Sequence, residues 1–271
     1  MNPGQIRFKN IVILTGAGIS AESGISTFRD SNGLWEQYRI EDVATPEAYQ
    51  KDPLTVWKFY SMRRLQAAEA HPNKAHEAIV KLAEKKNKEI HLITQNVDVL
   101  HQRADQREII PPICMHGSLN ESRCINCETV YFDDHAYFDL KGNYAPQSTV
   151  LCNPGQRAST QYLHQYKLNY KNFLPLSPCC NTPLRPHIVW FGEIPFHMAK
   201  IDRLLSAADL FVSIGTSGQV YPAAGFLQIA KTAGAYTVCI NKEEIPQRGH
   251  IDQFIQGHAS LRVPEFFESL T

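Results

Sequence analysis

Residues 11–29 have the sequence IVILTGAGISAESGISTFR, an apolar run that leads directly into a glycine-containing loop. The apolar part, Ile11–Leu14, is typical of a buried strand. Gly16 and Gly18 would let the backbone approach a phosphate closely, and a helix starting after them would direct N–H groups at an anion. The spacing differs from G-x-G-x-x-G, because the third glycine comes only at Gly24. The segment therefore predicts an α/β protein that binds a nucleotide phosphate, without indicating hydride transfer.

Three more apolar runs have the composition of parallel core strands, at residues 90–93, 210–214 and 236–240. Each of the four predicted strands is followed by polar or glycine residues. Ligands of an open parallel sheet bind outside the carboxyl ends of its strands, so we expect these turns to line one crevice. The spacing of apolar residues between the strands predicts helices at 53–69, 74–84, 200–208 and 222–233.

The composition sets the class of protein. The chain has 271 residues, of which 43% are hydrophobic and 20% charged, and its formal net charge is zero. These values suit a soluble enzyme, and a neutral chain has no overall field that would attract nucleic acid. No apolar run approaches the roughly 18 residues of a membrane span, and the N-terminus lacks the apolar stretch of a signal peptide. We therefore expect a cytoplasmic protein whose seven cysteines are metal ligands or buried thiols.

A loop-rich segment in the middle of the chain carries most of the cysteines. Cys124 and Cys127 form a C-x-x-C knuckle, and Cys180 offers a third thiolate downstream. This set predicts a structural zinc site. The alternatives are unrelated buried thiols or a redox pair, although a redox C-x-x-C would be expected to start a helix. The fourth ligand is Cys152 or Cys179, and we prefer Cys152 because two adjacent cysteines on one tetrahedral ion would be strained.

Polar side chains follow the predicted strand at 90–93, in the sequence QNVD at Gln95–Asp98. Amide and carboxylate groups at this position can bind a ribose, an amide or a water, but the same residues are equally common in turns and helix caps. His116 follows another expected strand end, and a pKa of about 6.5 would suit a general base. A single histidine among eleven is nevertheless more often structural.

Two further segments have residue types that suit a peptide substrate. The run RPHIVWFGE at 185–193 is either a core strand or an exposed edge to which an extended peptide adds as a strand. Tyr60 and Arg63 lie three residues apart in a predicted helix and so share one face. A phenol beside a guanidinium can bind a carboxylate. Such a spacing more commonly reflects an aromatic side chain in the core next to an arginine in solvent, without a binding role.

Taken together, the motifs resemble those of sirtuins, which are NAD-dependent protein-lysine deacylases. The matches in family order are GAGIS, SGISTFR, TQNVDVLH, HGSL, LRPHIVWFGE, IGTSGQVYPAA and VPEF. They extend over nearly the whole chain and outweigh the structural interpretations of Gln95–Asp98 and His116. Tyr60 and Arg63 also match the Y-x-x-R pattern of class III sirtuins, the mitochondrial and bacterial type, which recognises acidic acyl groups such as succinyl and malonyl.

The resemblance implies a Rossmann-type NAD-binding domain of residues 1–35, 75–118 and 186–271. It implies a smaller domain built from a helical module, 36–74, and a zinc-binding insert, 119–185. NAD and the acyl-lysine peptide would meet in the cleft between the two domains.

The resemblance also implies roles for individual residues. His116 would be the general base, with Asn96 and Asp98 as further catalytic residues. Tyr60 and Arg63 would bind the acyl group. The substrate lysine would lie among Val189, Phe191, Glu193 and Val220. NAD would contact Gly16, Ala17, Gly18, Ser20, Phe28, Arg29, Gln95, Asn96, Asp98, Gly215, Thr216, Ser217 and Asn241.

The implied reaction consumes NAD. The acyl oxygen attacks the anomeric carbon as nicotinamide leaves, which gives an alkylimidate, and His116 then takes a proton from the ribose hydroxyl that attacks this intermediate. The products are free lysine, nicotinamide and O-acyl-ADP-ribose. We therefore predict a desuccinylase and demalonylase that also deacetylates. The alternatives are a mono-ADP-ribosyltransferase with the same NAD site and a non-catalytic binding module that senses NAD or is stabilised by zinc.

One motif departs from the sirtuin pattern. A second C-x-x-C usually precedes the L-R-P run, whereas here Ser177 stands at its first position, in the sequence SPCC at 177–180. Zinc would then use Cys152 or Cys179 instead, or bind weakly, or be absent. The catalytic motifs do not depend on this choice.

Overall fold

The computed structural model describes residues 8–27, 38–85, 87–132 and 174–270. Several two-residue strands outside these ranges are described by their backbone alone. They are β2 (Leu34–Trp35), β8 (Tyr137–Phe138), β9 (Tyr144–Ala145), β10 (Cys152–Asn153), β11 (Gln156–Arg157) and β12 (Leu168–Asn169).

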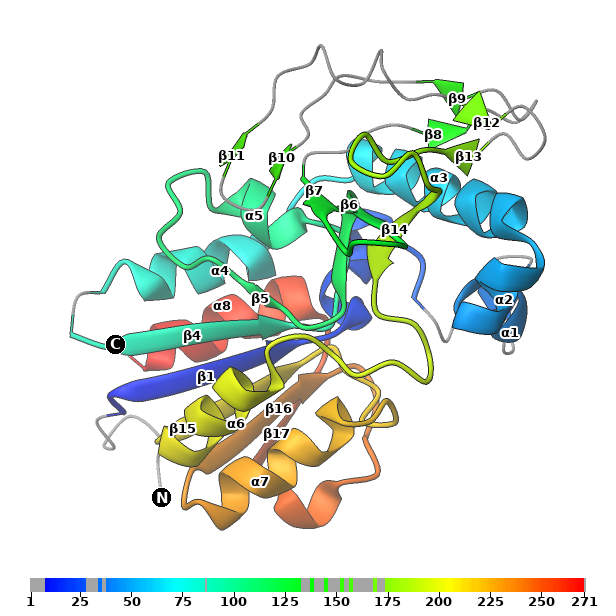
Figure 1. Ribbon diagram of the computed structural model, residues 1–271. Helices are drawn as coiled ribbons and strands as arrows, with labels where there is room; N and C mark the ends of the chain where they lie inside the picture. Colours follow the sequence, from blue (N-terminus) through cyan, green and yellow to red (C-terminus); the bar gives the residue numbers. More distant parts are fainter. Residues whose placement is uncertain are drawn as a thin grey trace.

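A parallel sheet forms the centre of the larger domain, with the strand order β17-β16-β15-β1-β4-β5 (Figure 1). Its strands are β1 (Asn10–Thr15), β4 (Glu89–Thr94), β5 (Ile113–Cys114), β15 (Leu210–Ile214), β16 (Tyr236–Asn241) and β17 (Gln253–Gln256). The four strands expected from the sequence are confirmed, and so is the α/β class. Thr15 pairs with Thr94 and with Ile214, so the central strands end level and their turns share one edge.

Helices cover both faces of this sheet (Figure 1). Ile11 and Ile13 pack into one apolar cluster with α4 and α8, and Val12 and Leu14 pack into another with α6 and α7. Successive side chains of a strand point to opposite faces, and both faces here are buried, which explains the continuous apolar runs. The four helices are α4 (Lys74–Ala83), α6 (Met198–Ala207), α7 (Phe226–Thr232) and α8 (Ala259–Ser269).

Some of the helices begin at a residue whose side chain caps them, as Asn73 does for α4. Before α3 (Pro53–Glu69), Asp52 Oδ1 accepts the backbone N–H of Thr55 at 3.1 Å, and proline occupies the first helical turn. All four helices expected from the sequence are confirmed to within a few residues. The remaining helices include α5 (Leu100–Ala104), and among the helices described here none is both long and apolar enough to pass through a bilayer.

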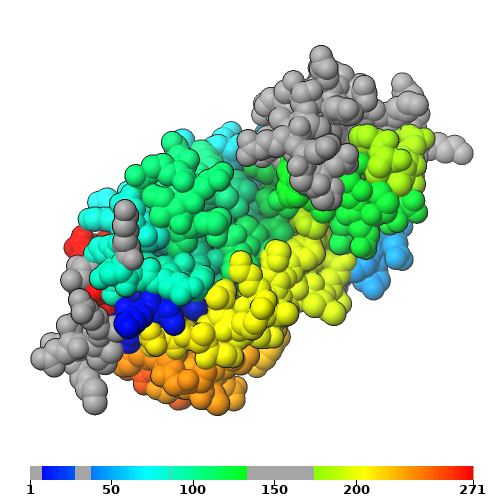
Figure 2. Space-filling view, turned by 60° about the vertical axis from the view of Figure 1, so that its left-hand side comes forward, coloured from blue at the N-terminus to red at the C-terminus, as the bar shows by residue number. Residues whose placement is uncertain are grey.

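A second apolar core lies beside the sheet domain and contains Trp57, Phe59 and Tyr60 of α3. In the space-filling view its light blue and green segments lie together at the right-hand end of the molecule (Figure 2). Its elements include β3 (Tyr38–Arg39), α1 (Ile40–Val43), α2 (Pro46–Lys51), β6 (Gly117–Cys124), β7 (Val130–Tyr131), β13 (Leu174–Pro175) and β14 (Leu184–Ile188). Strands β14, β6 and β7 form an antiparallel sheet. The boundaries expected for the two domains stay a prediction.

Two buried histidines join the helices to the sheet. The rings of His76 on α4 and His101 on α5 lie 4.8 Å apart between centroids. Nε2 of His101 is 2.9 Å from Thr15 Oγ1, which in turn donates to Thr94 Oγ1 at 2.8 Å. Burial lowers the pKa of His76 to about 4, and it lowers the pKa of His101 well below the usual value. Both histidines are therefore neutral in the folded protein at pH 7.

We expect the free energy of unfolding to fall as the pH is lowered from about 6.5 towards 4. The unfolded chain protonates His76 near pH 6.5, whereas the folded chain resists protonation until its pKa of about 4. The contribution of neutral His76 to the free energy of unfolding is therefore fully present above about pH 6.5. It is lost as the pH falls below this value, and the loss reaches at most about 3 kcal/mol. Urea unfolding at about pH 7.5, 6 and 4.5 measures this loss. His76→Gln should flatten the pH dependence, and an unchanged slope would contradict the assignment.

Candidate active site

The loop after β1 is held by the loop after β15. Gly16 N–H donates to Ile214 O at 2.9 Å, and Gly18 N–H donates to Gly215 O at 2.8 Å. A Cβ added at Gly16 or Gly18 would lie within 2.8 Å of the backbone of Gly215. These glycines therefore allow two loops to touch, which the sequence alone did not predict.

Two short 3-10 helices form here, at Ala17–Ile19, which contains Gly18, and at Ala21–Ser23. They stand where the sequence suggested that a longer helix would start. Gly24 has a φ of +87° and ends the second turn, so this residue adopts a left-handed conformation that favours glycine. Phe28 and Arg29, which we expected over the nicotinamide ribose, lie outside the described residues.

The turn after β4 folds back onto the loop after β1. Asn96 Nδ2 donates to Gly16 O and to Ser20 Oγ, each at 3.2 Å. Asp98 accepts the N–H of Leu100 at 3.0 Å just before α5, whose N-cap residue is Val99, so this side chain closes a turn and does not cap the helix. Burial raises the pKa of the Asp98 carboxyl, which is only 5% exposed. The turn therefore places an amide and a nearly buried carboxyl beside the glycine loop.

The next two strand ends complete this edge of the sheet. Gln95 Nε2 donates to Thr216 Oγ1 at 3.2 Å, and Asn241 Nδ2 donates to Thr216 O at 3.0 Å. Ser217 Oγ accepts the N–H of Gln219 at 3.2 Å. Gly215, Thr216, Ser217 and Asn241 thus lie at the same edge of the sheet as the loop after β1.

His116 follows β5 and reaches the same turn. Its Nδ1 lies 3.0 Å from Gln95 O. A carbonyl oxygen can only accept, so Nδ1 carries the proton and Nε2 holds a lone pair, which is the arrangement that a base needs. Burial lowers the pKa of His116, and the hydrogen bond to Gln95 opposes this only in part. The imidazole is therefore neutral at pH 7.

Tyr60 and Arg63 both lie on helix α3. Both are nearly buried, at 1% and 5% exposure, so the expectation of a solvated arginine is wrong. Arg63 Nη1 donates to Gln66 Oε1 at 3.1 Å, and the charge of Arg63 lowers the pKa of Asp98 against the larger effect of burial. The guanidinium therefore acts electrostatically on the Asp98 carboxyl.

The segment 185–193 supplies both an edge strand and a loop. Strand β14 lies at the edge of its sheet and pairs with β6. Val189 N–H donates to His116 O at 2.9 Å, which ties the loop to the expected base. Phe191 is 47% exposed, and Val220 is half-buried in the loop after β15.

Glu193 has a carboxylate that is engaged within the protein. It accepts Arg185 Nη1 at 2.6 Å, Arg185 Nη2 at 2.9 Å and the N–H of Trp190 at 2.9 Å. Burial alone would raise the pKa of Glu193, but these hydrogen bonds hold it below its usual value. Direct contact of this carboxylate with a substrate lysine stays a prediction. Sequence reasoning missed Arg185 and Trp190, although an Arg and a Glu inside one apolar run are a signal of a buried ion pair.

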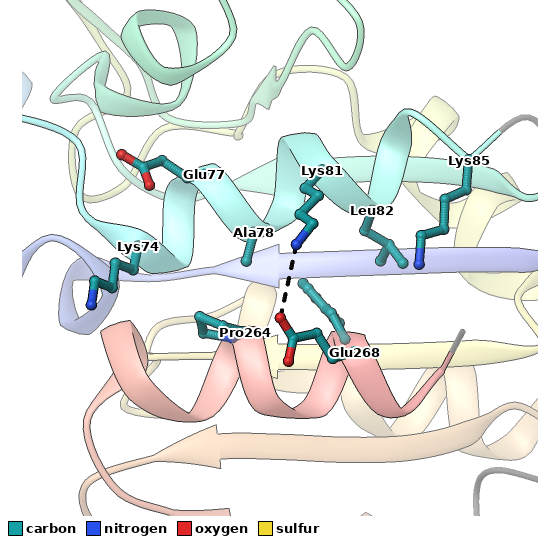
Figure 3. Close-up of a pocket in the computed structure, with 9 residues that line it drawn as sticks. Lys74, Glu77, Ala78, Lys81, Leu82, Lys85, Pro264 and Glu268 are labelled. Atoms are coloured by element: carbon teal, nitrogen blue, oxygen red, sulfur yellow. Dashed lines mark ion pairs between the residues drawn. The ribbon is translucent and has the colours of Figure 1, made fainter.

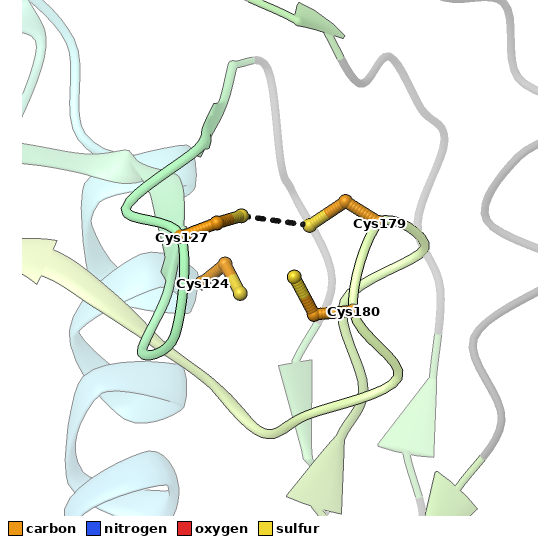
Figure 4. Close-up of side chains that lie close together, drawn as sticks. All are labelled: Cys124, Cys127, Cys179 and Cys180. Atoms are coloured by element: carbon orange, nitrogen blue, oxygen red, sulfur yellow. Dashed lines mark hydrogen bonds between the residues drawn. The ribbon is translucent and has the colours of Figure 1, made fainter.

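Four cysteines converge at the base of the second domain (Figure 4). The Sγ atoms of Cys124, Cys127, Cys179 and Cys180 all lie within 4.8 Å of one another. Four Zn–S bonds of about 2.3 Å place the sulfur atoms of a tetrahedral site about 3.8 Å apart, so the group fits zinc. When bound, the ion would join the turn after β6 to the turn before β14.

The cluster contains Cys179, the alternative to our preferred Cys152. The chain turns at residues 178–180, so the side chains of Cys179 and Cys180 point towards one centre (Figure 4). The expected strain of two adjacent cysteines at one ion therefore does not keep their Sγ atoms apart. Ser177 Oγ lies 3.2 Å from Cys124 Sγ and contacts a ligand candidate instead of replacing it. The side chain of Cys152 lies outside the described residues.

A hollow on the far side of the larger domain does not belong to this site. It lies between α4 and α8, where Lys81 pairs with Glu268 at 3.8 Å (Figure 3). Lysines, glutamates and a few apolar side chains line it, and none of the expected site residues does. We therefore place the candidate site at the carboxyl ends of the parallel strands, where the expected site residues lie, and not in this hollow.

The glycine loop, the amide and carboxyl turn and the neutral histidine at one edge of a parallel sheet define a nucleotide-binding α/β protein. Comparison with known proteins identifies the family, because residues 16–222 match the Sir2 family. A protein of Vibrio vulnificus strain YJ016 named "NAD-dependent protein deacylase" is 42% identical, over 97% of this chain and 94% of its own length. A protein of the same name from Escherichia coli strain K12 is also 42% identical, over 99% of this chain and 84% of its own length.

Solved structures agree with this assignment. A Sir2 homologue in complex with NAD has a TM-score of 0.77 and 34% identity, over 99% of this chain and 91% of its own. A structure described as Sir2 with a p53 peptide and NAD has a TM-score of 0.71 and 29% identity, over 96% and 91%. The chain belongs to the Sir2 family. The family predicted from the sequence is thereby confirmed.

Gly215→Ala should weaken NAD binding at least about tenfold. The residue has a φ of +60°, and an added Cβ would lie 2.4 Å from Ile19 N, so the two loops would separate. Isothermal titration with NAD measures the affinity. Gly234→Ala is the control, because its φ is +100° but nothing lies within 4 Å of the added carbon. Unchanged binding by Gly215→Ala would show that the loop contact is dispensable.

Cys179→Ser should lower the zinc content of the purified protein, whereas Cys152→Ser should leave it unchanged. Only the first substitution removes a sulfur from the observed cluster. Inductively coupled plasma mass spectrometry after dialysis against a chelator gives the zinc per chain. The opposite result would restore Cys152 as the fourth ligand.

Proposed function

We propose that this Sir2-family chain is an NAD-dependent protein-lysine deacylase that removes succinyl and malonyl groups in addition to acetyl groups. One observation carries the proposal: in the turn at residues 95–98, Gln95 O lies 3.0 Å from Nδ1 of the neutral His116, and the Asp98 carboxyl is acted on by the charge of Arg63 on α3. The histidine suits the NAD chemistry, and the arginine suits an acidic acyl group.

His116 is suited to the role of general base. Its Nδ1 proton is held by Gln95 O at 3.0 Å, which leaves the Nε2 lone pair to accept a proton from a ribose hydroxyl. Its lowered pKa keeps the imidazole neutral at pH 7. The same carbonyl belongs to the turn that carries Asn96, so the base and the expected ribose contacts are set by one segment of backbone.

The NAD contacts that we propose all come from the edge of the parallel sheet. Gly16, Ala17, Gly18 and Ser20 would surround the pyrophosphate, because the small residues of this loop let a phosphate approach the backbone closely. Gly215, Thr216, Ser217 and Asn241 would hold the adenosine half. Gln95, Asn96 and Asp98 would lie around the nicotinamide ribose. The names of the relatives and the NAD complex of a homologue support this assignment.

Arg63 and Tyr60 support the choice of acyl group. A succinyl or malonyl group ends in a carboxylate, and a nearly buried guanidinium beside a phenol offers it charge-assisted hydrogen bonds. Such bonds contribute about 1.5–3 kcal/mol. An acetyl group is neutral and smaller and would use the same reaction without this contribution.

The acyl-lysine peptide would bind as an extended strand beside the loop at 189–193. The exposed Phe191 and the half-buried Val189 and Val220 offer the apolar surface for the lysine stem. Main-chain hydrogen bonds would supply the affinity, as in other strand additions. The Sir2 structure with a p53 peptide supports a peptide substrate.

Mass spectrometry of the purified protein with NAD and two matched peptides tests the proposal. We expect NAD-dependent loss of the succinyl group from one peptide and of the acetyl group from the other, with nicotinamide and O-acyl-ADP-ribose as products. Removal of acetyl alone would contradict the role of Arg63. If neither peptide changed while ADP-ribose accumulated on protein, a transferase would be the better assignment.

Arg63→Met should lower kcat/KM for the succinyl peptide at least about tenfold more than for the acetyl peptide, because only succinyl loses a charge-assisted hydrogen bond. Arg64→Met is the matched control. Arg64 is equally buried on α3, but it donates to Leu119 O at 2.6 Å and to Ser122 Oγ at 3.1 Å. Its loss should affect both substrates alike. Steady-state assays on the two peptides measure kcat/KM for each variant. Equal losses of kcat/KM for the two peptides in Arg63→Met would contradict the role of Arg63 in binding the acyl group.

A further inference from the structure

The hydroxyl of Tyr60 receives a hydrogen bond from Trp190, whose Nε1 lies 3.0 Å away. A phenolic oxygen has one hydrogen and two lone pairs, whereas an indole N–H can only donate. The contact therefore occupies a lone pair of Tyr60 and turns the hydroxyl hydrogen away from Trp190. Burial raises the pKa of Tyr60, so the hydroxyl keeps its hydrogen at neutral pH.

Trp190 itself has little freedom to move. Its side chain is 2% exposed, and its ring packs against Tyr49 with 5.5 Å between centroids. Its backbone N–H donates to Glu193 Oε2 at 2.9 Å. An indole held at its ring and at its backbone directs its N–H in one direction, so the orientation of the Tyr60 hydroxyl is set before a substrate arrives.

Arg185 strengthens this arrangement. Its guanidinium lies over the Trp190 ring, with Cζ 3.4 Å from the centroid. Glu193 holds the guanidinium through both carboxylate oxygens, which fixes the cation in place. A cation over the face of an indole attracts the electron density of the ring. The N–H of Trp190 is therefore a stronger donor to Tyr60 than an indole packed among apolar side chains alone.

We infer that Trp190 is a positioning residue for the recognition of acidic acyl groups, because it holds the Tyr60 hydroxyl with its hydrogen available to a carboxylate. The inference rests on the proposed function, since only an acidic acyl group supplies that carboxylate. An acetyl group has no acceptor beyond its carbonyl, so acetyl-lysine gains nothing from the orientation. Trp190 therefore acts on the choice of acyl group and not on the reaction step.

The test compares Trp190→Phe with Trp57→Phe. Both substitutions keep an aromatic ring and remove a buried indole N–H. Trp57 lies one helical turn before Tyr60 on α3, but its Nε1 donates to Leu184 O at 2.8 Å. We expect Trp190→Phe to lower the ratio of succinyl to acetyl kcat/KM about three- to tenfold. Trp57→Phe should leave that ratio unchanged, even where it lowers the melting temperature equally.

A double substitution shows whether Trp190 acts through Tyr60. In a Tyr60→Phe background, adding Trp190→Phe should change the ratio no further, because the hydroxyl that it orients is gone. A full additional loss in the double variant would overturn the inference. The inference would also be overturned if Trp190→Phe and Trp57→Phe had the same ratio of succinyl to acetyl kcat/KM. If Arg63→Met still lowered this ratio, the proposed function would stand. If Arg63→Met left the ratio unchanged, the proposed function and the inference would both fail.

A measurement on the unaltered protein covers the case in which Trp190→Phe does not fold. Of the three tryptophans, the indole signal of Trp190 can be assigned by elimination in protein labelled with 15N-tryptophan, using Trp35→Phe and Trp57→Phe. Titration with the succinyl peptide without NAD should shift the Trp190 indole signal. The carboxylate would accept the hydrogen of the Tyr60 hydroxyl, and this would change the hydrogen bond that Trp190 Nε1 donates to the same oxygen. The acetyl peptide should shift it much less. Equal shifts with the two peptides would overturn the inference.

Discussion

The N–H of Gly18 donates to the carbonyl of Gly215 across the carboxyl edge of the parallel sheet, at 2.8 Å. This contact brings two loops together at backbone distance, and neither loop has room there for a Cβ. Asn96 and Ser20 then meet on the resulting surface. Asn73 adds a third connection, because it donates to Ile19 O at 2.8 Å while capping helix α4. The expected NAD contacts are thus held by rigid elements and not by a loose loop.

The parts of the fold that depend on long apolar runs could be predicted from the sequence. The strands containing Ile11–Leu14 and Leu210–Ile214 are buried on both faces, so their composition alone identifies them. Strand β5 was expected only as a strand end before His116, and β17 was missed. The first has two residues, and the second, with the sequence QFIQ, is only half-buried, so neither gives a strong apolar signal. The 3-10 turns after Gly16 were missed because tertiary contact with Gly215, and not local preference, fixes that backbone.

The site could be predicted only where a motif supplied both identity and position. Asn96, Asp98 and His116 belong to neighbouring turns, but a backbone carbonyl, Gln95 O, fixes the orientation of the His116 ring. No sequence pattern indicates this contact. Cys179 was ranked below Cys152 by an argument from spacing, but spacing does not show where a turn directs two adjacent side chains. The pairing of Glu193 with Arg185 likewise depends on the path of the loop between them.

Helix α3 buries two consecutive arginines, and they meet this cost in different ways. Arg64 donates to backbone carbonyls and a hydroxyl of β6, so its charge is compensated by the fold itself. Arg63 donates to Gln66 Oε1 at 3.1 Å, and its charge lowers the pKa of the buried Asp98 carboxyl against the larger effect of burial. A buried cation is costly unless charges or hydrogen bonds compensate for its lost hydration. In the proposed function, an acyl group that brings its own carboxylate would add a further compensating charge beside Arg63.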